Sequence, residues 1–145
     1  MTENELNRLK SYLTEIYSTN ILEKFLDVKI VEISEGKAVY QMKIKPEHSN
    51  MFGIAHGGIL ASIADIIMGI PCFTLGKSVV TIDMNINFIK SVPLGTTITG
   101  IGQVTGNGNK IMRTIGKIFN EENQLVAQSQ GSYYVTGEFN LENYL

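Results

Sequence analysis

The segment that most constrains the fold runs from Gly57 to about Ile70 and is apolar at almost every position. On a helix, its apolar side chains cover nearly the whole circumference: Ile59, Leu60, Ile63, Ala64, Ile66, Ile67 and Ile70. A helix that is apolar on all sides lies inside a protein, so we predict a buried central helix. Gly69 and Pro71 are expected to weaken or kink its end, because proline lacks a backbone N–H and crowds the preceding turn.

One charged residue, Asp65, lies within this apolar segment. A buried carboxylate is costly unless it is paired or hydrogen-bonded. The residues alone leave three interpretations open. Asp65 is a structural carboxylate bonded to a neighbouring backbone or hydroxyl group, a carboxylate at an interface, or a catalytic group that activates water or attacks a substrate.

The rest of the chain is predicted to form one further helix and six strands. Residues 3–18 carry an apolar stripe at helical spacing. The strands are two around a turn at Glu35-Gly36, and then residues 78–91, 96–105, 110–119 and 124–136. The strand over 78–91 alternates most regularly: Val80, Ile82, Met84, Ile86 and Phe88 are expected to face the helix, with Thr81, Asp83, Asn85 and Asn87 on the polar face.

This order of elements predicts an α+β fold in which an antiparallel sheet wraps around the buried helix. We expect a single domain over 1–145, with an N-terminal helical segment at 1–24 and a core at 25–137. One helix covers only one face of such a sheet and leaves its edges open, which favours a homo-oligomer.

Composition excludes several classes of function. The net charge is −2 and no basic stripe is present, which argues against a nucleic-acid partner. The single cysteine, Cys72, rules out an intrachain disulfide and reads as a core residue. The polar N-terminus lacks the apolar core of a signal peptide, and the run Ile59–Phe73 is shorter than the roughly 20 residues of a membrane span. We therefore expect a cytoplasmic protein with no membrane partner.

The string HSNMFGIAHGGILASIAD, residues 48–65, resembles the motif of the hotdog-fold thioesterases, in particular the phenylacetate-pathway (PaaI-like) branch of acyl-CoA thioesterases. That motif has the form H-x-N-x-x-G-x-x-H-G-G and is followed by an acidic residue. Here it falls on His48, Asn50, Gly53, His56, Gly57 and Gly58, and six intervening residues precede Asp65. The segment TIDMNINFIKSVPLG, residues 81–95, is also similar to the family, and the resemblance covers about residues 25–137.

The resemblance implies hydrolysis of an acyl-CoA thioester to a free acid and coenzyme A, which is part of the substrate, so that no cofactor is expected. It implies that Asp65 is the nucleophile or the general base and that Asn50 orients water or the thioester. Gly57 opens the helix, where backbone N–H groups lack intrahelical partners and the helix dipole is positive. These are the elements of an oxyanion hole, and the resemblance assigns that role to the Gly57 N–H.

Four further residues are candidates for substrate binding. His56 and Gly58 flank the oxyanion donor, and His56 either caps the helix or shapes the pocket. Thr81 matches a Ser or Thr that assists the site in some family members, but its alternation also fits a surface position. Lys90 is available for the phosphates of coenzyme A, although a solvated surface charge is the simpler interpretation. His48 is expected to order the loop, and no zinc site is predicted from the two histidines.

Gly57 and Asp65 are eight residues apart, or about 12 Å along one helix. One thioester carbonyl must lie near both groups, and a single helix does not easily bring them together. Two antiparallel helices related by a two-fold axis do. We therefore predict a site shared between protomers of a homodimer or of a dimer of dimers (a homotetramer).

Two other functions compete with hydrolysis. A non-catalytic hotdog protein would bind acyl-CoA without releasing a thiol. A hotdog hydratase or dehydratase would use an Asp/His pair in a motif that is not found here. Tyr133, Tyr134 and Phe73 are expected to be packing residues rather than parts of an acyl pocket, and the acyl group is not fixed by the sequence.

Overall fold

The computed structural model describes residues 1–145. Its elements in chain order are α1 (Glu3–Tyr17), α2 (Ile21–Leu26), β1 (Lys29–Ser34), β2 (Lys37–Lys43), the short 3-10 helix η1 (Pro46–His48), α3 (Gly57–Phe73), β3 (Lys77–Phe88), β4 (Thr97–Asn107), β5 (Ile111–Phe119), β6 (Leu125–Glu138) and the short 3-10 helix η2 (Leu141–Asn143). The N-terminal helix, the six strands and the central helix confirm the predicted order. The short helix α2 was not predicted.

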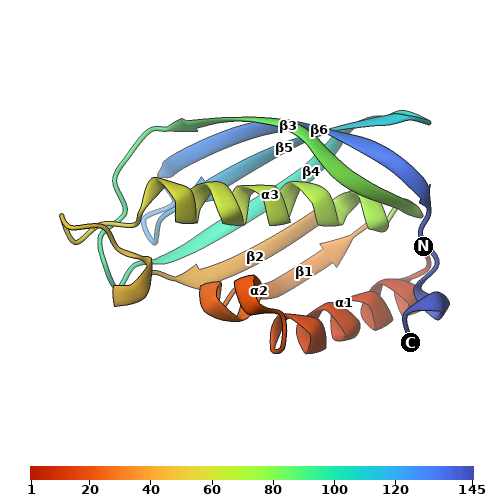
Figure 1. The fold of residues 1–145 in the computed structure, drawn as a ribbon, viewed down its shortest axis with the longest axis horizontal. Helices are drawn as coiled ribbons and strands as arrows, with labels where there is room; N and C mark the ends of the chain where they lie inside the picture. The colour runs from red at the N-terminus through yellow and green to blue at the C-terminus, as the bar shows by residue number, and fades with distance from the viewer.

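The six strands form one antiparallel sheet in the order β1-β2-β4-β5-β6-β3, and the sheet curves around α3 (Figure 1). Helices α1 and α2 lie beside β1 and β2, and the two termini lie close together (Figure 1). This confirms the α+β architecture with a sheet around a buried helix. Strands β1 and β3 are the two edges, and no strand pairs with β3 on its outer side. No helix combines the length and apolar character that crossing a membrane requires.

Helix α3 continues through Pro71 to Phe73, so the expected weakening at Gly69 and Pro71 does not end it. Because Pro71 has no N–H, the carbonyl of Ile67 loses its helical partner. This carbonyl points at β4, where Gly102 has no side chain; a Cβ built on Gly102 would lie only 1.5 Å from the Ile67 oxygen. The helix therefore tolerates proline, and its backbone packs directly on the sheet at Gly102.

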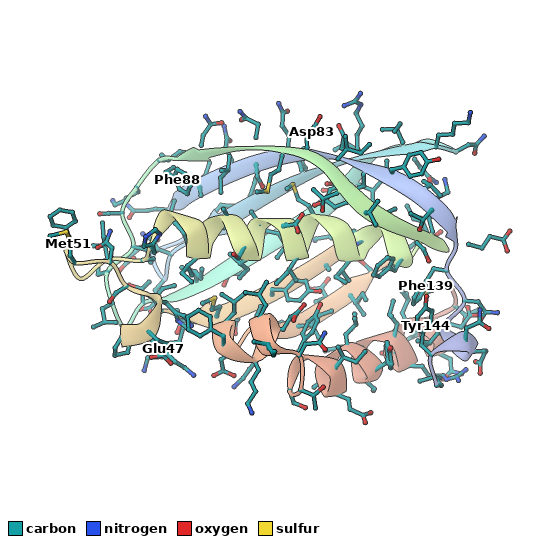
Figure 2. The ribbon with its side chains drawn as sticks, viewed as in Figure 1. Glu47, Met51, Asp83, Phe88, Phe139 and Tyr144 are labelled. Atoms are coloured by element: carbon teal, nitrogen blue, oxygen red, sulfur yellow. The ribbon has the colours of Figure 1, made fainter.

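Strand β3 does not keep the single alternation that the sequence predicted. Thr81 pairs with Tyr133 and Asp83 pairs with Ser132, so Ile82 is an extra residue in a β-bulge. The bulge reverses the faces: Thr81 faces α3, whereas Val80 and Ile82, expected inside, are exposed. Beyond the bulge the prediction holds, because Met84 and Ile86 pack on the core and Asp83 lies on the outer side of β3 (Figure 2).

The contact at Gly102 predicts a large effect of a single methyl group. Gly102→Ala is expected to lower the free energy of unfolding by more than about 3 kcal/mol, because the new Cβ overlaps a backbone oxygen that cannot move without the helix. Chemical denaturation measures this loss. The matched control is Gly137→Ala in β6, where the added Cβ meets nothing within 4 Å. Equal stability of the two variants would contradict this packing.

Candidate active site

Asp65 is half-buried on α3, and two hydroxyl groups reach its carboxylate. Thr81 donates to Oδ1 at 2.8 Å, and the Tyr133 hydroxyl lies 3.0 Å from the same oxygen and 3.1 Å from the Asp65 carbonyl oxygen. Thr81 comes from β3 and Tyr133 from β6, and the two residues are paired across the sheet. The structure thus brings together two predicted residues, Asp65 and Thr81. It adds Tyr133, which was expected to be packing.

The sequence did not predict the contact of Tyr133 with Asp65, because no local motif distinguishes Tyr133 from other strand residues. Its alternation with Tyr134 is the only signal: Tyr133 is 2% exposed and faces α3, whereas Tyr134 is 48% exposed on the other face. Burial, together with the neighbouring Asp65 carboxylate, raises the pKa of Tyr133 well above its ordinary value. The phenol therefore keeps its proton at neutral pH and acts as a hydrogen-bond donor.

Asp65, Thr81 and Tyr133 are among the residues that line a cleft of about 320 Å³. The other lining side chains are mostly apolar and come from α3, β3 and the end of α1: Ile66, Ile70, Phe73, Val79, Val80 and Tyr17, with Glu23 of α2. An apolar pocket of this size with a few polar groups is typical of a small-molecule site. A larger hollow of about 930 Å³ lies between the chain termini and contains none of these residues.

The N-terminus of α3 presents backbone N–H groups as hydrogen-bond donors. His56 is the N-cap, and its Nδ1 accepts the N–H of Gly58 at 3.1 Å, which confirms the capping interpretation of His56. The N–H of Gly57 has no acceptor in the protein. The Phe88 ring lies beside Gly57, 3.5 Å from where a Cβ would stand (Figure 2). A free backbone donor therefore stands beside an exposed aromatic ring.

The residues of the preceding loop have structural partners. The Asn50 Oδ1 accepts the N–H of Phe52 at 2.9 Å, and its Nδ2 makes no hydrogen bond to the protein. His48 is fully buried: Lys45 N–H donates to its Nδ1, and its Nε2 donates to the carbonyl of Phe25. His48 thus orders the loop, as expected. No cluster of three or more His, Cys, Asp or Glu side chains is arranged to hold a metal ion.

Lys90 and Gly57 lie away from Asp65 within one chain. Lys90, in the loop after β3, donates from Nζ to the side-chain oxygen of Gln124 at 2.9 Å on the surface. Gly57 and Asp65 lie on the same helix, eight residues apart, so the rise of the helix separates them by about 12 Å. The free donor of Gly57 and the carboxylate of Asp65 therefore do not meet within the protomer.

Comparisons with known proteins agree with this fold and site. Residues 52–127 match the model of the thioesterase superfamily. The chain is 31% identical over 106 residues to acyl-coenzyme A thioesterase 13 of Homo sapiens, covering 71% of this chain and 76% of the relative. The motif at residues 48–65 lies largely within the matched region. The chain therefore belongs to the thioesterase superfamily, a class of thioester hydrolases.

Two solved structures share the architecture. The Escherichia coli PaaI protein of the phenylacetic acid degradation operon superposes with a TM-score of 0.82 at 26% identity, covering 90% of this chain and 96% of that one. A Streptococcus mutans protein bound to acetyl CoA superposes with a TM-score of 0.76 at 26% identity, covering 78% and 91%. These likenesses confirm the hotdog fold and the PaaI-like branch predicted from the sequence.

Cys72, the one thiol of the chain, lies on α3 but is fully buried. Burial raises the pKa of this thiol to about 11, so it is neutral at pH 7 and is not the nucleophile of the cleft. We expect no reaction of the folded protein with an aromatic disulfide reagent that reports free thiols, and one equivalent on unfolding. Rapid labelling of the native protein would contradict this.

Proposed function

We propose that the protein hydrolyses acyl-CoA thioesters to a free carboxylic acid and coenzyme A. The observation that carries the proposal is the Asp65 carboxylate, held by Thr81 and Tyr133 at the wall of an apolar cleft. The relative named acyl-coenzyme A thioesterase 13 and the S. mutans neighbour bound to acetyl CoA support coenzyme A as the thiol carrier. The apolar lining suits an acyl group that carries no charge.

The chemistry follows from the groups present. The Asp65 carboxylate either removes a proton from the attacking water or attacks the thioester carbon itself. The carbonyl oxygen becomes negative and is stabilised by the Gly57 N–H at the positive end of α3. The carbon–sulfur bond then breaks, coenzyme A leaves as a thiolate that takes a proton, and water completes the acid. Asn50, whose Nδ2 is free, positions the water, and His56 and Gly58 shape the donor end.

The site is composed of residues from two protomers in this proposal. The unpaired N–H of Gly57 is proposed to bind the carbonyl oxygen of the thioester. Asp65 of the same chain lies too far along the helix to reach the same thioester group. Strand β3 offers a 12-residue edge with exposed apolar side chains at Val80, Ile82 and Phe88. Pairing of two such edges would place two α3 helices antiparallel, as a homodimer or within a dimer of dimers.

Lys90 is proposed to bind the phosphates of coenzyme A. It follows β3 directly, and β3 ends with Phe88 beside Gly57. Its surface partner is the uncharged Gln124, so its charge is available to an anionic ligand. The position places a cation near the end of α3 at which the thioester carbonyl is bound.

Replacing Asp65 tests the reaction directly. Asp65→Asn keeps the size and the acceptor oxygen but removes the base, and we expect thiol release from an acyl-CoA panel to fall by more than about 100-fold. Glu122→Gln, which makes the same change at an exposed carboxylate in the turn between β5 and β6, is the control and is expected to retain activity. If the wild-type protein binds acyl-CoA tightly but releases no thiol, the protein is instead a non-catalytic acyl-CoA-binding protein.

The shared site is tested by complementation. Gly57→Pro removes the N–H donor at a position where proline is accommodated, because it is the first helical residue and the preceding His56 already has an extended backbone (ψ 137°). Gly57→Ala also adds a Cβ beside the Phe88 ring but keeps the N–H, so it controls for the added Cβ. We expect Gly57→Pro to be folded and inactive, and Gly57→Ala to retain more activity.

Co-expressing Gly57→Pro with Asp65→Asn should then restore thiol release. Half of randomly assembled dimers are mixed and each carries one intact composite site, which gives about a quarter of wild-type activity. A site contained within one chain predicts no restoration at all.

A further inference from the structure

Both hydroxyl donors to Asp65 act on one oxygen of its carboxylate. Thr81 and Tyr133 lie 2.8 Å and 3.0 Å from Oδ1, and no protein group donates to Oδ2. Rotation about the terminal torsion of an aspartate would otherwise exchange the two oxygens, because that torsion has a broad, nearly two-fold profile. Two donors on one oxygen hold the plane of the carboxylate, so that one oxygen is occupied and the other is free to react.

We propose that Tyr133 is a positioning residue that, with Thr81, fixes Oδ1 of Asp65 and leaves Oδ2 as the oxygen that reacts. The inference rests on the proposed catalytic role of Asp65. It assigns to Tyr133 no contact with the substrate; the residue acts through the carboxylate. Holding a reacting group in a near-attack geometry contributes to kcat, and small displacements of it reduce the rate strongly.

The protonation state of Tyr133 suits this role. Its ring is buried, and burial with the adjacent carboxylate raises its pKa, so the hydroxyl remains a donor across the working pH range. The hydroxyl also lies 3.1 Å from the Asp65 carbonyl oxygen. The phenol therefore contacts both the backbone and the side chain of the same residue, which fixes their relative orientation.

The ring reaches Asp65 because α3 has a glycine one turn later. A Cβ built on Gly69 would lie 3.3 Å from Cε1 of Tyr133, closer than an ordinary van der Waals contact. Glycine is unfavourable in the middle of a helix, so its presence at this point needs a packing reason. We infer that Gly69 provides the space through which the Tyr133 ring approaches Asp65.

The first experiment compares Tyr133→Phe with the neighbouring Tyr134→Phe, both assayed as the assembled protein on an acyl-CoA that the wild-type hydrolyses. We expect Tyr133→Phe to lower kcat by about 10- to 100-fold with KM within about twofold. Tyr134→Phe, the same chemical change on the opposite face, should leave both unchanged. A wild-type kcat for Tyr133→Phe, or a raised KM with kcat intact, would overturn the positioning role.

The second experiment uses Gly69→Ala, which displaces the ring without removing the hydroxyl. We expect a smaller fall in kcat than for Tyr133→Phe, and no further fall when Gly69→Ala is added to Tyr133→Phe. Independent, multiplicative losses would overturn the link between Gly69 and Tyr133. Thermal unfolding checks that each variant is folded. Asp65→Asn in the same assay separates the two hypotheses: full activity there defeats the proposed function, whereas an inactive Asp65→Asn beside an active Tyr133→Phe defeats only this inference.

Discussion

The close contact between α3 and the floor of the sheet is the constraint on which the rest of the structure depends. At Gly102 the helix backbone itself touches the strand, and Pro71 makes this possible by releasing the carbonyl of Ile67 from the helix ladder. Gly100 lies two residues before Gly102 on β4, Gly116 pairs with Gly102 on β5, and both leave room for the Ile67 side chain. A helix held this close has little freedom to slide or rotate. Its functional groups are therefore fixed relative to β3 and β6, which supply Thr81 and Tyr133.

Glycine has three different tasks along α3. Gly57 leaves a backbone donor accessible, Gly58 gives its N–H to the His56 cap, and Gly69 gives room to an aromatic ring from the sheet. Each of these positions carries a cost in helix stability relative to alanine. The extensive apolar packing of the helix offsets that cost. The fold thus places the positions that weaken the helix at the places where chemistry or close packing needs them.

The sequence predicted what depends on local pattern. The buried helix followed from its all-round apolar composition, the strands from their alternation, and the family from the spacing between His48 and Asp65. The structure confirms these features, and they could be predicted because each depends on residues that are close together in the sequence. The capping role of His56 and the loop role of His48 were also anticipated, since both residues lie beside the groups they bind.

What the sequence missed depends on contacts between distant segments. A β-bulge needs only one residue out of register, so the regular alternation of residues 80–88 hid it, and Val80 and Ile82 were wrongly placed inside. Tyr133 lies 68 positions from Asp65, and no spacing rule connects them. The roles of Asn50, Gly57, Gly58, Asp65, Thr81 and Lys90 in catalysis and binding stay predictions, because contacts alone do not measure turnover.

The bulge at Ile82 also makes the register of β3, and not only its composition, part of the site. If the same residues alternated without a bulge, the register of Met84 and Ile86 would turn Ile82 and Val80 toward α3 and Thr81 outward. Deleting Ile82, by contrast, would join Thr81 to Asp83 in a regular ladder and leave Thr81 facing Asp65. The extra residue therefore lets one strand present a hydroxyl group to the carboxylate and, further along, apolar side chains to the core.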